Sequence, residues 1–317
     1  IDYAQNEGIA STLCSYHKNF IGGVDSGVLP KAAMSVTTSM ICDGNINTFR
    51  HMEQKHQVES YVLDIPNTYS PEAERYVVGQ LQELIELLET KTGQKLDMNE
   101  LKAAIQRENE SKEYYKAFLK EQKHRYYPNT MTLDLYMLFA SHLNIGTQET
   151  LDFFKCLAED VKTYPEFNGK GILWVHLMPY YQETLQQYMN YQEKYYIQAC
   201  DLNLDYMEPL DAAHPLEALA KKMILNIYNG PYERKVEMIR HLVKEFQSDA
   251  VIHFCHWGCK QSSGGVMLLK EAMREENVPM LILDGDALDR RNSHDGQIKT
   301  RLQAFLELID NIEEDKD

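Results

Sequence analysis

Cysteines are the residues best able to do chemistry in this 317-residue sequence, which contains six of them. Cys259 follows a strand-like apolar run and precedes a predicted helix that begins near Gly264. Ligands of open parallel sheets bind at such strand–helix junctions. The N–H groups and partial positive charge of a helix N-terminus stabilise a thiolate or an anionic cluster. Cys259 is therefore the strongest candidate ligand for an inorganic cofactor.

Two further cysteines have a similar setting. Cys42 ends a β-rich segment, and Asp-Gly-Asn and a helical pattern follow it. Cys14 lies among polar residues in Leu-Cys-Ser-Tyr-His, with Gly22 and Gly23 downstream. Glycines next to such positions let the backbone approach a bulky inorganic group closely. We therefore predict that Cys14, Cys42 and Cys259 belong to one site.

The remaining three cysteines fit the usual behaviour of a free thiol, which is that of a small buried hydrophobe. Cys156 lies inside an apolar-periodic helical pattern over residues 151–157, and Cys200 ends a predicted strand. Cys255 is expected to point inward from its strand. Its spacing from Cys259, with two histidines nearby, leaves a zinc site open as an alternative, although zinc signatures usually contain a second ligand pair.

Composition excludes several classes of function. The formal charge of −16 argues against nucleic acid or anionic membranes as partners, because both need a basic face. Six irregularly spaced cysteines are not typical of a secreted disulfide framework, and they favour a reducing cytoplasm. No signal peptide and no apolar run long enough to span a membrane is seen. The first residue is Ile1, so the chain is expected to begin partway through a natural sequence.

Hydrophobic patterning predicts an α/β protein. A strand over 34–41, a helix over 43–55 and a strand over 60–65 form a βαβ unit. Residues 70–160 show a helical pattern, with Pro71 at one helix start, Asp97 as the N-cap of the next helix and an apolar run over 131–143. Apolar strands then alternate with helices, which indicates a parallel sheet covered on both faces. These later strands are predicted at 172–177, 195–200, 250–254 and 280–283.

Two α/β domains joined by a helical region follow from this pattern. The first, over residues 1–164, combines a partial N-terminal α/β domain with the helical region, and the second covers residues 165–317. We expect the N-terminal domain to be incomplete, because only two strands precede its helices.

Several segments resemble the 2-hydroxyglutaryl-CoA dehydratase / benzoyl-CoA reductase superfamily, and the resemblance covers essentially the whole chain. The motifs that carry it are His256-Trp-Gly-Cys259-Lys-Gln-Ser-Ser-Gly264, Val278-Pro-Met-Leu-Ile-Leu-Asp-Gly-Asp286, Asp289-Arg-Arg-Asn292, Gln297 with Thr300-Arg-Leu-Gln-Ala-Phe305, Leu13-Cys-Ser-Tyr16 and Ile41-Cys-Asp43.

This resemblance implies two Rossmann-like domains in each of two related subunits. It also implies a 4Fe–4S cluster whose metal ligands are Cys14, Cys42 and Cys259, which leaves one iron open as in catalytic metal sites. Relatives usually have a further N-terminal stretch that is missing from this chain, so catalytic residues are not assigned.

The implied activity is that of the iron–sulfur subunit of an (R)-2-hydroxyacyl-CoA dehydratase, a hydro-lyase that removes water in a syn manner. One electron added to the thioester carbonyl gives a ketyl radical that expels the α-hydroxyl. An ordinary base cannot do this, because burial and neighbours shift a pKa by only about 3–5 units. The implied partners are a paralogous second subunit in a heterodimer, an ATP-dependent iron–sulfur activator and a CoA-thioester substrate, in an anaerobic cytoplasm.

Alternatives remain open. The chain could belong to a benzoyl-CoA reductase-like or double-cubane-cluster reductase, with Cys255 as an extra ligand. It could be a non-catalytic electron-relay partner subunit, or a zinc-dependent or cluster-free binding protein. Other polar residues have weaker predicted roles: Lys18, Lys31 and Lys260 as contacts for CoA phosphates, Asp284 and Asp286 in positioning the last helix, Arg290, Asn292, Gln297 and Arg301 as surface pairs, and His253 and His256 in packing.

Overall fold

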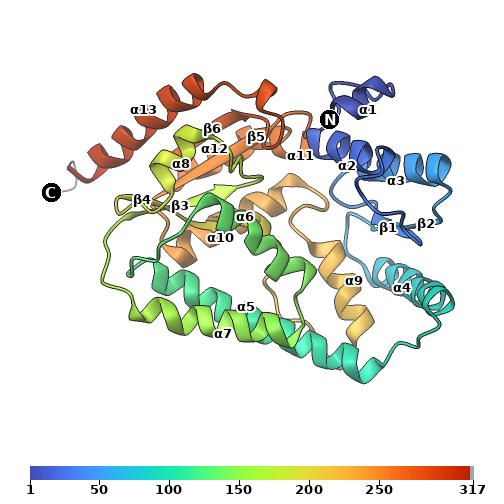
Figure 1. The fold of residues 1–317 in the computed structure, drawn as a ribbon. Helices are drawn as coiled ribbons and strands as arrows, with labels where there is room; N and C mark the ends of the chain where they lie inside the picture. The colour runs from blue at the N-terminus through green and yellow to red at the C-terminus, as the bar shows by residue number, and fades with distance from the viewer. Residues whose placement is uncertain (315–317) are drawn as a thin grey trace. The chain divides into compact units, whose positions relative to one another are not determined.

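The structure is a computed structural model that describes residues 1–314 (Figure 1). The chain forms two compact units. Unit 1 comprises residues 1–106 and 208–232, and unit 2 comprises residues 107–207 together with the described chain from residue 233 onward. Both contain parallel strands and helices, which confirms the predicted α/β class. Within the described chain, no helix is long and apolar enough to cross a membrane.

Unit 1 contains the predicted βαβ element. Strands β1 (Ser35–Thr38) and β2 (Ser60–Leu63) pair in parallel, and helix α3 (Asp43–His56) connects them. Two helices precede this element, α1 (Asp2–Asn6) and α2 (Ser15–Asp25), and α2 packs against α3.

A charged cluster joins α2 and α3. Asp25, the last residue of α2, accepts hydrogen bonds from His51, Lys55 and His56 of α3 at 2.7–3.0 Å. Its carboxyl side chain is fully buried. Burial alone would raise the pKa of Asp25, but the three hydrogen bonds outweigh it and lower the pKa to about 2. We call this group the Asp25 cluster.

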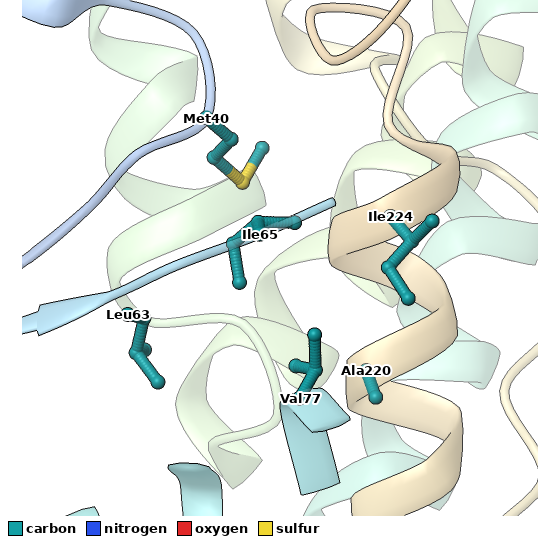
Figure 2. Close-up of a cluster of buried hydrophobic side chains, with 6 residues drawn as sticks. All are labelled: Met40, Leu63, Ile65, Val77, Ala220 and Ile224. Atoms are coloured by element: carbon teal, nitrogen blue, oxygen red, sulfur yellow. The ribbon is translucent and has the colours of Figure 1, made fainter. Parts of the chain in front are cut away.

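The apolar core of unit 1 is completed by two helices that are distant in sequence. Helix α4 (Pro71–Thr92) begins as predicted at Pro71, with the Ser70 hydroxyl accepting the N–H of Ala73. Helix α9 (Pro215–Leu225) packs against α4. Figure 2 shows the buried side chains from β2, from the segments that follow the two strands and from both helices: Met40, Leu63, Ile65, Val77, Ala220 and Ile224.

Unit 2 is built on a four-stranded parallel sheet with the strand order β4-β3-β5-β6. The strands are β3 (Lys170–Val175), β4 (Tyr195–Cys200), β5 (Ala250–His256) and β6 (Met280–Gly285). Every residue of β4 and β5 is buried, as expected for strands of a covered sheet. The order reverses between β3 and β5, because the chain proceeds from β3 to β4 on one side and returns to β5 on the other. In such sheets ligands bind at this switch point, beyond the carboxyl ends of the strands.

Helices surround this sheet. The connecting helices are α5 (Met98–Gln122), which begins in unit 1, α6 (Met131–Leu138), α7 (Gln148–Asp160), α8 (Glu183–Met189), α10 (Tyr232–Phe246), α11 (Lys260–Ser263), α12 (Val266–Glu275) and α13 (Asp295–Glu314). The predicted N-cap Asp97 accepts the N–H of Asn99 at 2.8 Å. The predicted run over 131–143 is not one α-helix, since it becomes a π-helix over Phe139–Leu143.

The helical segment that follows residue 106 packs with the second sheet rather than with the first. Tyr115 of α5 and Phe154 of α7 meet at a ring separation of 5.1 Å in the core of unit 2. The two compact units therefore divide the chain differently from the predicted boundary at residue 164. The domain boundary itself stays a prediction.

Candidate functional site

All three predicted ligand cysteines occupy the N-cap position of a helix. Cys14 precedes α2, Cys42 precedes α3 and Cys259 precedes α11. None of the three thiols makes a side-chain capping hydrogen bond. The helix predicted to begin near Gly264 is α12, whose N-cap is Gly265, and the short helix α11 lies between it and Cys259. The first turn of a helix has unpaired backbone N–H groups, which favour negative charge at the N-cap.

In unit 1 the thiol of Cys42 faces a histidine. His17, on α2, places Nε2 3.4 Å from the Cys42 Sγ. The other ring nitrogen, Nδ1, lies 3.0 Å from the hydroxyl of buried Thr48 on α3. Burial lowers the pKa of His17 below its usual value, so the imidazole is neutral near pH 7 and carries one N–H.

The backbone around Cys42 is shaped for this contact. Ile41 has a φ of 72°, a left-handed conformation that is costly for a β-branched residue. At Gly44 a Cβ would lie 2.7 Å from the His17 Nε2 and 3.2 Å from the Cys42 Sγ. Only glycine therefore leaves room for the thiol and the imidazole, which fits a site that brings its backbone close to a bulky group.

In unit 2 the thiol of Cys259 also faces a histidine, at the switch point of the sheet. Strand β3 ends at Val175, and the next residue, His176, has a φ of 78°. Strand β5 ends at His256, and Gly258 turns the chain with a φ of 73°. These turns place the His176 Nε2 3.6 Å from the Cys259 Sγ.

A buried ion pair holds His176 in place. The Asp201 carboxylate accepts the backbone N–H of His176 at 2.7 Å, and its other oxygen lies 3.0 Å from the Lys235 ammonium. The two charged side chains are almost fully buried, at 0% and 1% exposure. Removing either would leave an uncompensated charge. Burial and then the nearby Lys235 keep the pKa of His176 well below its ordinary value.

Two further histidines, both on β5, form hydrogen bonds with the backbone of nearby segments. His253 donates from Nε2 to the Ser262 carbonyl at 2.5 Å, and burial followed by Lys235 lowers its pKa to about 4. His256 accepts the N–H of Ala287 on Nδ1 at 3.0 Å, so that nitrogen carries no proton. Their predicted packing role is confirmed.

The other cysteines have different surroundings. Cys255 and Cys200 are buried as predicted, and burial raises the pKa of Cys255 to about 11 and that of Cys200 well above its usual value. The prediction that Cys156 is a core thiol is wrong, because this residue is exposed. The buried face of α7 is formed by Leu151, Phe154 and other residues at helical spacing, and position 156 falls outside it.

Several polar residues with weaker predicted roles have defined contacts in the structure. Lys18 is buried and donates to the Ser11 carbonyl at 2.7 Å, so it is not a solvated surface lysine, and its contact with CoA phosphates stays a prediction. Asp286 is buried and accepts the N–H groups of Leu288 and Asp289, which positions the loop leading into α13 as predicted. Arg301 pairs with Asp284 at 3.2 Å, as expected of a surface residue.

Among residues 1–314, no group of three or more histidine, cysteine, aspartate or glutamate side chains that could hold a metal ion stands out. Cys14 and Cys42 belong to unit 1, whereas Cys259 belongs to unit 2. The convergence of the three thiols therefore stays a prediction. The sequence did not single out His17, His176, Asp201 or Lys235 as site residues. The predicted strand over 172–177 contained His176, whereas β3 ends at Val175.

The chain thus combines parallel α/β units with three cysteines at helix N-caps. The family model described as 2-hydroxyglutaryl-CoA dehydratase, D-component, matches residues 1–309, and the chain belongs to this family. Both the recognition of the superfamily and the assignment to the 2-hydroxyacyl-CoA dehydratase class of enzymes are thereby confirmed.

Relatives of known function extend over nearly the whole chain. The chain is 25% identical to the (R)-phenyllactyl-CoA dehydratase alpha subunit of Clostridium sporogenes, over 97% of this chain and 79% of the relative. It is 21% identical to the lactoyl-CoA dehydratase alpha subunit of Anaerotignum propionicum, over 98% and 81%. It is 19% identical to a benzoyl-CoA reductase subunit of Thauera aromatica, over 97% and 79%.

Proposed function

We propose that this chain is the iron–sulfur subunit of an (R)-2-hydroxyacyl-CoA dehydratase. Cys14, Cys42 and Cys259 would hold a 4Fe–4S cluster and leave one iron open. The observation that carries the proposal is the shared N-cap position of these three cysteines. Cys200 and Cys255 lie within strands rather than at helix N-caps, and burial raises the pKa of both thiols.

The residues present fit an anionic cluster. Helix N-termini stabilise the negative charge of thiolates, and the missing Cβ of Gly44 leaves space beside the Cys42 sulfur. When bound, such a cluster supplies a single electron and an iron that polarises the thioester carbonyl. The chain itself supplies the thiolates, the neutral imidazoles of His17 and His176 beside two of them, and the buried Asp201–Lys235 pair that orients His176.

The reaction balances without a net redox change. A substrate carbonyl that has gained one electron expels the α-hydroxyl as hydroxide, and the β proton then becomes acidic enough to leave. Hydroxide and proton make water, the electron returns to its donor, and the 2-enoyl-CoA remains. Because the electron is recycled, the activator and its ATP are needed to start turnover rather than once per product.

The substrate class and the partners are supported by the relatives. Two of them are named for (R)-phenyllactyl-CoA and lactoyl-CoA, both of which are 2-hydroxyacyl thioesters, and both are named as alpha subunits. A paralogous second subunit, an ATP-dependent activator and a cytoplasmic location complete the proposal. The relative named for benzoyl-CoA reductase favours a reductase as the second candidate.

The test is anaerobic co-production of this chain with its partner subunit and activator, followed by quantification of iron and sulfide. The complex is then given ATP, titanium(III) citrate and a series of (R)-2-hydroxyacyl-CoA esters. We expect the 2-enoyl-CoA, with ATP consumed in far less than stoichiometric amounts. Cys259→Ala should abolish iron binding, and the exposed Cys156→Ala is the matched control that should retain it.

Three results would contradict the proposal in different ways. A reduced product with ATP consumed in fixed ratio would indicate the reductase. A cluster-containing complex whose turnover depends on the partner's cluster alone would indicate an electron relay. A protein without iron and sulfide would indicate a zinc-dependent or cluster-free function.

A further inference from the structure

Two of the candidate thiols, one in each unit, each lie next to a histidine side chain. The His17 Nε2 lies 3.4 Å from the Cys42 Sγ, and the His176 Nε2 lies 3.6 Å from the Cys259 Sγ. These histidines are 25 and 83 positions from their cysteines, so neither contact follows from local sequence. The same atom of the same residue type thus meets a helix-capping thiol twice, in two separately folded settings.

In unit 1, side chains determine which ring nitrogen faces the sulfur. The Thr48 hydroxyl lies 3.0 Å from Nδ1 of His17 and belongs to a buried residue. Because Nδ1 contacts this hydroxyl, Nε2 is the ring nitrogen that points at the thiol. The space around this contact is closed to a side chain at position 44, because a Cβ there would lie within 2.7 Å of Nε2.

In unit 2, a backbone hydrogen bond holds the histidine in place beside the sulfur. Asp201 accepts the His176 N–H at 2.7 Å, and the buried Lys235 keeps that carboxylate compensated. The left-handed φ of 78° is maintained by this hydrogen bond, although it is unfavourable for a residue with a Cβ. A strained conformation that is held by a buried ion pair, and that aims a ring at a thiol, indicates a selected geometry.

We propose that His17 and His176 are positioning residues that donate Nε2–H hydrogen bonds to the sulfurs of Cys42 and Cys259, and so raise the reduction potential of the centre that these thiolates hold. The inference rests on the proposed function. Hydrogen bonds to the sulfurs of a cluster tune its potential, because they stabilise the more negative, reduced state more than the oxidised state. The two histidines therefore set how readily the site accepts its initiating electron.

The test compares His17→Leu and His176→Leu with His17→Gln and His176→Gln in the assembled complex. A glutamine amide retains an N–H near the position of Nε2, whereas leucine does not. Titanium(III) citrate delivers one electron per centre, and electron paramagnetic resonance follows the reduced form through a redox titration. His241→Leu is the control, since His241 is 66% exposed on α10.

Each leucine variant should keep its iron and lower the equilibrium constant for reduction about tenfold, which is about 59 mV for a one-electron couple. The glutamine variants should recover most of the shift, and His241→Leu should show none. If Cys42 and Cys259 hold one centre, the double leucine variant should shift a single signal by about the sum of the two.

An unchanged midpoint potential in both iron-replete leucine variants overturns the inference and leaves the proposed function standing. Wild-type protein that lacks iron and sulfide removes the proposed function itself. If a leucine variant does not fold, Thr48→Val keeps the imidazole but removes the hydroxyl beside Nδ1. That variant should lower the potential by less than His17→Leu, and an unchanged potential in Thr48→Val counts against the inference as well.

Discussion

Gly44→Ala is the substitution that most directly tests the packing around Cys42. Gly44 is the second residue of α3 and has no side chain between the thiol and His17. Glycine to alanine within a helix normally stabilises a protein, by up to about 1 kcal/mol. At position 44 the substitution should instead destabilise the protein, because the new Cβ would lie 2.7 Å from the His17 Nε2 and 3.2 Å from the Cys42 Sγ.

The magnitude follows from what must move. His17 is held by Thr48 through its other ring nitrogen, so it cannot swing away without losing that contact. Overpacking of this kind costs about 1–3 kcal/mol. After allowing for the helix-propensity gain, we expect Gly44→Ala to lower the free energy of unfolding by up to about 2 kcal/mol. Gly79, inside α4, is the matched control, since a Cβ there would meet no atom within 4 Å. Gly79→Ala should stabilise by about 0.5–1 kcal/mol.

Urea unfolding followed by circular dichroism measures both variants, and a His17→Ala background completes the cycle. Without the imidazole the principal clash is gone, so Gly44→Ala should there resemble Gly79→Ala in sign. The reasoning is refuted if Gly44→Ala is as stable as Gly79→Ala in the wild-type background, or if removing His17 does not relieve the cost.

Three further changes test other parts of the structure. Lys235→Met should lower the free energy of unfolding by about 3–5 kcal/mol, because Asp201 would remain charged and buried; a change below about 0.5 kcal/mol in urea unfolding would contradict this. Asp25→Asn should cost about 1–2 kcal/mol above pH 4, where the depressed pKa of Asp25 adds stability to the folded state. That difference should vanish as the pH falls toward 2, and a pH-independent difference in thermal unfolding would be evidence against the Asp25 cluster. Cys255→Ala should leave iron and sulfide per chain unchanged whereas Cys259→Ala removes them, and equal losses would favour a double-cubane centre instead.

The strands of unit 2 could be predicted because each contains a short apolar run, although the strand predicted at 172–177 passes the end of β3 at Val175. The predicted run at 195–200 is β4 itself, and the run at 250–254 lies within β5. The start of α4 at Pro71 could also be predicted, since proline is favoured in the first turn of a helix. Such features depend on neighbours in sequence, and local patterns are enough to find them.

The parts that failed depend on tertiary contacts. Nothing local marks His176 as a partner of Cys259, because the contact requires β3 and β5 to be neighbours in the sheet. Lys235 looks like an ordinary residue of an amphipathic helix until Asp201 is placed beside it. Cys156 was predicted to be buried from the apolar character of its segment, but the phase of α7 turns it outward.

The position of helix α9 in the sequence affects when unit 1 can fold during synthesis. Its Ala220 and Ile224 complete the core that Val77 and Leu63 begin, yet the ribosome synthesises the whole of residues 107–207 in between. Unit 1 therefore cannot complete its fold during synthesis in the usual N-terminal-first order. Its apolar core stays incomplete until about a hundred intervening residues have been made. A fragment that ends at residue 164 lacks α9 and would expose that core.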